Sequence, residues 1–419
     1  MKSSATWVRI LIYSGGLGLI GKLAQFAALT TLAVILLPAD FGRFAVAQIV
    51  ITGIASIVSS SFSLAANRAA AARAATDITS FGLVIAQSVF SNRRALGATL
   101  VLLVALAPIV YSILSGDGFQ PWTIVWASVA FSMVVADLAV GSLAGAGILR
   151  TSSIVDASRL LSGGVGALTL GISGGYVGAA FGLLLGDFCV TLIVLVNLYR
   201  YRRHVDREPR LGAEGTIRAG LLANGVTQLS MWVLTAAIQI VHGLDGVGAY
   251  SVANRFASLI LVAPGLISKN SLGLIAREAS GPVGTAKIRV AKHYLAISVV
   301  LVAVAVVVVL LAVHTVFAEL LSAYQGLQIV VLVLVIATAI RAIATSFGVV
   351  CVAWGELRIW QISDVVAACV VVVWLIICTI TQTMLPIMLL GIVIGAACAL
   401  TLRVGMIRRM TRQSRGSQQ

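Results

Sequence analysis

Four charged residues lie near the middle of long apolar runs of the sequence. They are Lys22, Asp137, Asp187 and Arg341. A charged side chain at the centre of a bilayer costs more than about 2.5 kcal/mol on insertion scales, so each needs a partner or a hydrated cavity. Lys22 has two acids, Asp137 and Asp187, at similar depth in its half of the chain. Two interpretations are therefore equally good for these three residues. They form a buried structural ion pair, or they have a functional role in ion coupling or ligand binding.

Arg341 differs because its half of the chain offers no acid at a comparable depth. Asp245, Glu319, Glu356 and Asp364 all fall at or near the ends of apolar runs. A guanidinium without an acid must face water, a cluster of backbone carbonyls or an anionic ligand. Its planar fork of donors suits a phosphate well. We therefore predict that Arg341 contacts a pyrophosphate.

Two further basic residues share one apolar run. Arg255 and Lys269 are fourteen positions apart, which leaves them about 40° apart around a helix. They would form a basic track on one face. Long cationic side chains near span ends also extend to the membrane surface. Extension to the membrane surface is the favoured interpretation for Lys269. For Arg255, the basic track and extension to the surface are evenly balanced.

Uncharged polar residues also align on helix faces. Gln228, Trp232 and Gln239 fall within a sector of about 40°, and an aromatic ring between two amides suggests a wall that faces carbohydrate. A second stripe spans a sector of about 60° and consists of Gln48, Thr52, Ser59 and Ser63. For that stripe, hydrogen bonding between packed helices is at least as good an interpretation.

No pattern for catalysis, nucleotide binding or metal binding stands out. The segment Gly16–Lys22 has the spacing of a phosphate-binding loop, but Leu23 replaces the required Ser or Thr and no strand precedes it. The four histidines are scattered without metal-ligand spacing. We therefore expect no enzyme activity, no cofactor and no metal.

The composition explains where these residues must work. The 419 residues are 60% hydrophobic and only 10% charged, whereas soluble domains carry about 25% charged residues. The mean hydropathy of +1.06 excludes a soluble enzyme, a secreted disulfide scaffold and a disordered chain. We attribute the net charge of +15 to basic residues in cytoplasmic loops, which set the orientation in the membrane, and not to nucleic-acid binding. All five cysteines lie in apolar runs and are expected to pack in the core.

Scanning for runs of roughly 20 apolar residues predicts an all-α polytopic protein with twelve transmembrane helices. The predicted spans are 9–36, 44–66, 95–115, 121–147, 155–174, 176–198, 219–241, 249–271, 294–318, 327–352, 362–383 and 385–405. The fifth is the weakest, because it starts with Asp156 and Arg159 and is rich in glycine. With an internal N-terminus, Arg43 is the one basic residue of the external loops. Both termini are therefore predicted to be cytoplasmic.

The two halves of the chain repeat in part. At an offset of 206 residues, Asp40–Ala47 aligns with Gly246–Ala253, with Gly42 over Gly248. Six spans per half preserve orientation, so we expect two parallel-repeat lobes around a V-shaped cavity. The predicted domains are an N-terminal lobe at 1–199, a cytoplasmic linker at 200–218, a C-terminal lobe at 219–407 and a basic cytoplasmic tail at 408–419.

These repeated segments carry a resemblance to a known family. Leu36–Ala45 resembles the first external turn of Wzx-type polysaccharide flippases, in the multidrug/oligosaccharidyl-lipid/polysaccharide exporter superfamily, and Gly246–Arg255 is similar to the turn that opens their eighth helix. The resemblance covers the whole chain in span count and topology, but only these two motifs are specific. Gln239 departs from the family, whose members often carry a charge late in the seventh span.

The resemblance implies export of undecaprenyl-pyrophosphate-linked oligosaccharides by alternating access, for surface polysaccharide biosynthesis in the cytoplasmic (inner) membrane of a bacterium. Without a nucleotide site, an ion gradient, the membrane potential or the substrate gradient must drive it. The expected partners are the lipid-linked substrate, membrane lipids, and a polysaccharide polymerase and glycosyltransferases, with the chain itself a monomer. A drug/cation antiporter of the same superfamily is the nearest alternative, which Asp137 and Asp187 keep open. A membrane enzyme of glycan assembly is disfavoured by the short external loops.

Overall fold

The computed structural model describes residues 16–73, 81–201, 203, 214–279, 285–315 and 327–416. Every regular element in these ranges is helical, as the hydropathy predicts. A chain in lipid must satisfy its backbone hydrogen bonds internally, and a helix does so within one segment. The all-α class predicted from the sequence is therefore confirmed.

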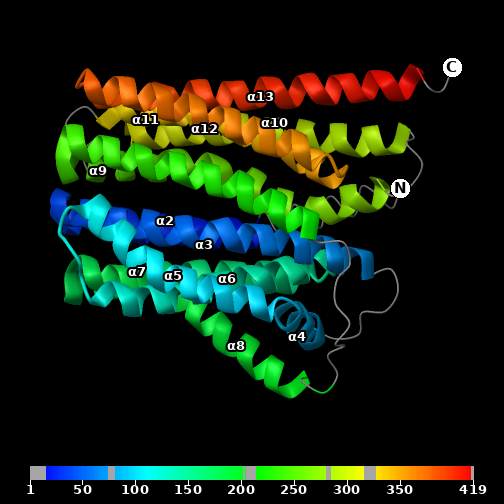
Figure 1. Cartoon of the computed structure of the whole chain (residues 1–419), viewed down its shortest axis with the longest axis horizontal. Helices are drawn as coiled ribbons and strands as arrows, with labels where there is room; N and C mark the ends of the chain where they lie inside the picture. Colours follow the sequence, from blue (N-terminus) through cyan, green and yellow to red (C-terminus); the bar gives the residue numbers. More distant parts are fainter. Residues whose placement is uncertain are drawn as a thin grey trace.

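The helices run side by side along the long axis of the molecule (Figure 1). Those of the N-terminal half are α2 (Gly18–Ile35), α3 (Pro38–Arg73), α4 (Phe81–Ser91), α5 (Arg93–Ser115), α6 (Trp122–Gly145), α7 (Leu149–Leu183) and α8 (Leu185–Tyr201). Those of the C-terminal half are α9 (Glu214–Ala279), α10 (Thr285–Thr315), α11 (Leu327–Ala353), α12 (Leu357–Ile380) and α13 (Leu385–Gly416). In Figure 1 the N-terminal half occupies the lower part of the view, where α8 leaves the bundle at an angle.

Ten helices of the described ranges are long and apolar enough to cross a membrane. Two of them, Leu149–Tyr201 with 53 residues and Gly220–Val262 with 43 residues, exceed the roughly 20 residues that one span needs. Each contains a glycine with non-helical backbone angles, Gly175 (φ 60°, ψ −151°) and Gly243 (φ 68°, ψ −169°). The predicted boundaries between spans five and six and between seven and eight fall at these glycines. All twelve predicted spans thus coincide with helical segments, although residues 9–15 and 316–318 lie outside the described ranges.

Three features of the helices differ from the hydropathy scan. The short helix α4 was not predicted, and its Gly82 lies directly against Asn197 and Tyr201 of α8. The helix α13 continues to Gly416, so the basic segment predicted as a tail extends this helix. The helix α9 already begins at Glu214, inside the predicted linker, most of which lies outside the described ranges.

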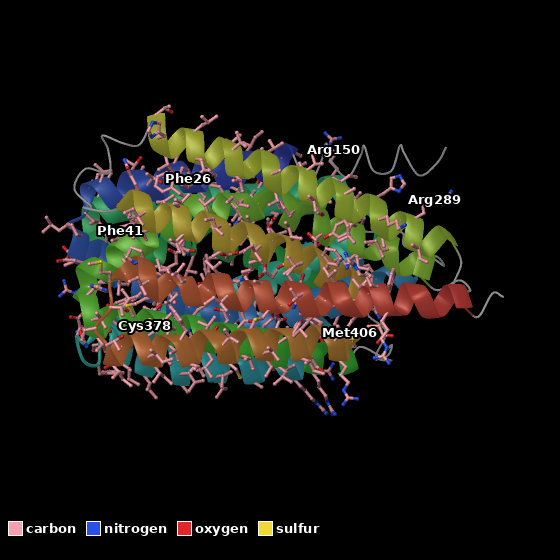
Figure 2. The ribbon with its side chains drawn as sticks, turned by 90° about the horizontal axis from the view of Figure 1, so that it is seen from above. Phe26, Phe41, Arg150, Arg289, Cys378 and Met406 are labelled. Atoms are coloured by element: carbon pink, nitrogen blue, oxygen red, sulfur yellow. The ribbon has the colours of Figure 1, made fainter. Side chains whose placement is uncertain are left out.

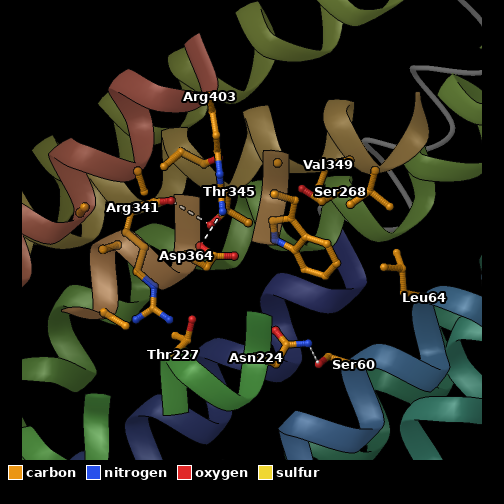
Figure 3. A pocket seen from close by; sticks show the side chains of 18 of the residues that line it. Ser60, Leu64, Asn224, Thr227, Ser268, Arg341, Thr345, Val349, Asp364 and Arg403 are labelled. Carbon is orange, nitrogen blue, oxygen red and sulfur yellow. Dashed lines mark hydrogen bonds and ion pairs between the residues drawn. The ribbon is translucent and has the colours of Figure 1, made fainter. Parts of the chain in front are cut away.

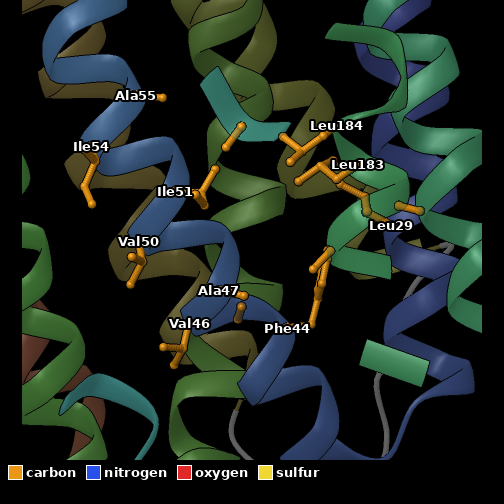
Figure 4. Packing of buried hydrophobic residues seen from close by; sticks show 14 of the residues in the cluster. Leu29, Phe44, Val46, Ala47, Val50, Ile51, Ile54, Ala55, Leu183 and Leu184 are labelled. Atoms are coloured by element: carbon orange, nitrogen blue, oxygen red, sulfur yellow. The ribbon is translucent and has the colours of Figure 1, made fainter. Parts of the chain in front are cut away.

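The core is centred on α3, which packs against α9 on one side and α6 on the other. Figure 4 shows successive buried side chains of α3, including Val46, Val50 and Ile54. These residues are 0–1% exposed. Its apolar side chains are buried on more than one face because neighbouring helices enclose it. Its position makes α3 the main contact between the two halves.

Helices at the periphery expose their apolar side chains instead. In α10 only 17% of the apolar window is buried, and Val307, Val308 and Leu311 are each more than half exposed. Lipid tails are as apolar as these side chains, so their exposure is compatible with a bilayer. Figure 2 shows Arg150 and Arg289 toward the end of the long axis opposite Phe41. Both arginines belong to the segments predicted to be internal.

The two repeated segments meet at one end of the bundle. Both are helical, one near the start of α3 and the other in α9 just after Gly243. A Cβ on Gly42 would lie 2.3 Å from the carbonyl oxygen of Leu244, and one on Gly248 would lie 2.8 Å from that of Pro38. The glycines therefore let the two backbones touch, as small residues do between membrane helices.

Candidate functional site

A cavity of about 450 Å³ lies between the two halves and is lined by residues of both (Figure 3). Its volume is in the range of pockets that hold drug-sized ligands. Side chains from α3, α6, α9, α11, α12 and α13 line it. The polar and charged ones are Ser60, Ser63, Asn67, Asp137, Asn224, Thr227, Ser230, Ser268, Arg341, Thr345, Asp364 and Arg403.

Arg341 projects into this cavity from the middle of α11, a helix that is otherwise almost entirely apolar. Figure 3 shows its guanidinium turned toward Thr227 and away from Asp364. Within the described ranges, no carboxylate lies within ion-pair distance of this guanidinium. Arg341 is therefore available to a ligand in the cavity.

The sequence placed Asp364 at or near a span end, whereas the structure brings it close enough to Arg341 for an electrostatic interaction. Asp364 lines the same cavity. The helix α12 begins at Leu357, seven residues earlier, so Asp364 lies about two turns, or roughly 10 Å, inside the bundle. Its partner is Arg403 of α13, whose Nη2 lies 2.5 Å from Oδ1 of Asp364. The predicted twelfth span ends at residue 405, which places Arg403 near a span end, whereas its side chain is only 4% exposed.

A second charged cluster lies in the N-terminal half and centres on Arg159 of α7. Its Nη1 lies 2.7 Å from Oδ1 of Asp137 and 3.3 Å from Oδ1 of Asp187, and its Nε lies 3.2 Å from Oδ1 of Asp156. Lys22 attracts Asp187 electrostatically. Arg159 thus pairs with both of the acids that the sequence assigned to Lys22. The helix α7 begins at Leu149, so Arg159 lies almost three turns inside the bundle rather than at a span end.

Arg255 does not line the cavity within the described ranges. Its Nη2 donates to Oε1 of Gln48 at 2.7 Å, and its guanidinium carbon lies 5.1 Å and 5.5 Å from the ring centres of Phe41 and Phe44. Such contacts between a guanidinium and aromatic faces are favourable. Arg255 therefore joins α9 to α3 near the repeated segments. The side chain of Lys269 lies outside the described residues.

The predicted carbohydrate-facing wall also lies elsewhere. The indole Nε1 of Trp232 donates to the carbonyl oxygen of Ile49 at 3.4 Å, and a Cβ on Gly53 would lie 2.6 Å from this nitrogen. Trp232 thus packs between α9 and α3. Gln239 approaches the turn at Gly116, and Gln228 is half-buried outside the cavity lining. Among the second stripe, Ser63 does line the cavity.

Several cavity residues were not singled out from the sequence. Asn224 and Ser60 come from different halves, and Nδ2 of Asn224 donates to Oγ of Ser60 at 2.7 Å. Trp360 of α12 also lines the cavity. An amide and a serine in an apolar helix are common packing residues. Which of these residues face the cavity depends on how each helix is rotated about its axis in the bundle.

In many secondary transporters the substrate site lies between two repeated halves of a helical bundle. No protein-family model and no curated protein matches the sequence. A MOP superfamily transporter from Pyrococcus furiosus, described as having a binding pocket of reverse polarity, superposes with a TM-score of 0.68 and 19% identity, covering 97% of this chain and 96% of that one. A multidrug resistance MATE family transporter in an outward-facing conformation gives a TM-score of 0.68 and 18% identity, covering 98% and 97%. A MATE transporter in complex with MaD5 gives 0.68 and 17%, with the same coverage. The chain therefore has the fold of MOP superfamily transporters.

Proposed function

We propose that this chain moves an undecaprenyl-pyrophosphate-linked oligosaccharide outward across a bacterial cytoplasmic membrane by alternating access, for surface polysaccharide biosynthesis. The observation that carries the proposal is Arg341, a guanidinium in the cavity without a carboxylate partner among the described residues. A guanidinium in a site of low dielectric binds phosphate oxygens through parallel hydrogen bonds. The lipid tail would stay in the bilayer while the headgroup enters the cavity.

The charge of the cavity wall supports an anionic headgroup. Within the described ranges, the wall from the C-terminal half carries Arg341 and Arg403 against Asp364, so its formal charge is +1. The carboxylate of Asp364 is already held by Arg403, and that of Asp137 by Arg159. The remaining positive charge is therefore the one on Arg341.

The uncharged part of the wall suits a neutral sugar. Hydroxyl and amide groups of Ser60, Ser63, Asn224 and Thr227 face the same cavity as Arg341. Hydroxyl groups both donate and accept hydrogen bonds, as sugar hydroxyls do. Phosphate at the guanidinium and sugar along this wall would bind one headgroup at two points.

Orientation and partners belong to the same proposal. We assign the end of the bundle that holds Arg150 and Arg289 to the cytoplasm, because basic residues gather in cytoplasmic loops. Both termini would then be cytoplasmic, and a polymerase and glycosyltransferases would act before or after this step. The repeated halves would form the two lobes of a monomer, joined by the linker at 200–218 and moving about the fixed headgroup.

The test is translocation of a lipid-pyrophosphate oligosaccharide in vesicles containing the purified protein. We expect Arg341→Ala to abolish translocation and Arg341→Lys to keep part of it, because lysine retains the charge without the fork. Arg409→Gln removes an exposed arginine of α13 outside the cavity lining and serves as the control. Normal translocation by a well-folded Arg341→Ala variant would remove this residue from the mechanism.

A drug/cation antiporter is the second candidate, favoured by the cluster around Arg159. Three carboxylates there face the positive charges of Arg159 and Lys22, and Asp137 also lines the cavity. A cation could bind to this excess of negative charge. Efflux of cationic drugs that is lost in Asp137→Asn, with no movement of the glycolipid, would favour this function over the first.

A further inference from the structure

We propose that Arg403 is a second phosphate-binding guanidinium, and that Asp364 is an internal carboxylate that holds Arg403 until a phosphate takes its place. This inference rests on the proposed function, because it assumes a cargo that carries phosphate. It adds a second phosphate-binding residue to the site. It also explains why an acidic residue lines a cavity that is proposed to bind an anion. The four residues that carry it are Arg341, Gly348, Asp364 and Arg403.

Arg403 is held in place by neutral acceptors as well as by the acid. Its Nε donates to Oγ of Ser363 at 2.8 Å, and its Nη1 donates to the carbonyl oxygen of Ala344 at 2.8 Å. These two bonds come from α12 and α11 and do not depend on Asp364. The guanidinium of Arg403 therefore keeps its orientation when its bond to Asp364 is lost. The three described bonds use three of its five N–H groups, so two donors remain for a ligand.

The helix α11 makes room for this guanidinium. A Cβ on Gly348 would lie 2.9 Å from Nη1 of Arg403 and 3.3 Å from its central carbon. Contacts that short would push the guanidinium out of its position. The glycine therefore lets the flat group lie against α11, beside the cavity. An arginine whose side chain only extended to the membrane surface would not need this space beside α11.

Asp364 lies between two arginines. It is bonded to Arg403, and Arg341 attracts it electrostatically without an ion pair. Arg341 and Asp364 line the same cavity, so a phosphate bound to Arg341 is within electrostatic range of Asp364, and the two negative groups repel each other. Charge balance is restored when the phosphate bonds to Arg403 and Asp364 withdraws from it. Two guanidiniums can then hold one pyrophosphate by paired, charge-assisted hydrogen bonds.

The test measures binding of two probes to the full-length purified protein by calorimetry. Inorganic pyrophosphate supplies the phosphate chemistry alone, and farnesyl pyrophosphate adds a lipid chain. We expect Asp364→Asn to bind both probes about tenfold more tightly, because the amide keeps an acceptor but removes the competing charge. We expect the double variant Arg403→Gln/Asp364→Asn to bind at least about tenfold more weakly than Asp364→Asn alone, because it loses the charged fork.

The double variant also removes the objection that Arg403→Gln alone leaves a buried carboxylate unpaired and damages the fold. Its thermal unfolding should match that of Asp364→Asn, and Arg409→Gln should bind both probes as the wild type does. If the double variant binds as tightly as Asp364→Asn, the role of Arg403 is purely structural and the inference is overturned, while a loss in Arg341→Gln would leave the proposed function intact.

The two probes separate the inference from the function on which it rests. Binding of inorganic pyrophosphate without binding of the lipid probe would support the pair of guanidiniums and contradict a lipid-linked cargo. Absence of binding of either probe to the wild-type protein would overturn both. Binding of both probes, with the expected order of the variants, would support both.

Discussion

Arg159 illustrates how a single buried side chain can organise charges from different helices. Its guanidinium meets Asp137 of α6, Asp156 of α7 and Asp187 of α8, and its side chain is 12% exposed. Removing one partner of a buried ion pair is costly because the other charge stays behind without compensation. Arg403 and Asp364 form a smaller arrangement of the same kind in the other half.

Arg159→Gln should therefore destabilise the protein by about 3–5 kcal/mol, the cost of breaking a buried pair. The measurement is thermal unfolding of the purified protein in detergent. Arg150→Gln removes an exposed arginine at the start of the same helix and should leave the unfolding temperature almost unchanged. Equal unfolding temperatures for the two variants would contradict the assignment of Arg159 as the centre of the cluster.

At the scale of the elements, close contacts between α3 and α9 hold the two halves of the chain together. The halves touch at Gly42 and Gly248, and Trp232 fills the space beside Gly53 further along the same pair of helices. Between them, Arg255 of α9 bonds to Gln48 of α3. Because the contact at Gly42 involves backbone atoms, it cannot be relieved by rotation of a side chain.

Gly42→Ala should lower stability by about 1–3 kcal/mol, the usual cost of overpacking. The new Cβ would lie 2.3 Å from a backbone oxygen, so α3 and α9 must move apart. Gly97→Ala, in the second turn of α5 with nothing within 4 Å of the new carbon, is the matched control and should not destabilise. Thermal unfolding of both variants measures the difference, and equal values would argue against the close helix contact.

Gly243→Ala tests the kink of α9 separately from packing. No atom lies within 4 Å of a Cβ built on Gly243, but its φ of 68° and ψ of −169° are accessible essentially only to glycine. We expect a loss of about 1–3 kcal/mol from backbone strain alone. An unfolding temperature equal to that of the wild type would show that the segment readily adopts a regular helix here.

At the scale of the whole molecule, the cavity is divided between the two halves. Asn224 and Ser60 bond across it at 2.7 Å. Alternating access requires the walls of such a cavity to separate and close in turn. Under the proposed function, a covalent link between these two positions would hold the two walls together.

A cysteine pair at Ser60 and Asn224, joined by a short thiol crosslinker, should therefore stop transport in vesicles. The five native cysteines are replaced first, because two of them, Cys189 and Cys369, are exposed and not packed in the core as the sequence predicted. A reducible crosslinker should allow transport to recover after reduction, and each single cysteine variant treated in the same way is the control. Undiminished transport by the crosslinked protein would mean that these walls do not move apart.

Much of the architecture was predictable because hydropathy is a local property. Each span is visible as an apolar run, and even the weak boundary between spans five and six is marked by glycines around Gly175. The helix α4 was missed because its 11 residues are too few for a spanning run. Arg341 was identified for the same local reason, since its charge lies in the middle of an apolar helix.

Which charges meet was decided only by the tertiary structure. A shift of a few residues in a span boundary moved Arg159, Asp364 and Arg403 from expected helix ends into the bundle interior. The sequence also does not specify how far each helix is rotated about its axis when it packs, so Trp232 turned toward α3 and Trp360 toward the cavity. Both effects depend on contacts between residues far apart in the chain. Local composition thus determined that the chain forms a helical membrane bundle, and packing between helices determined its ion pairs and its cavity.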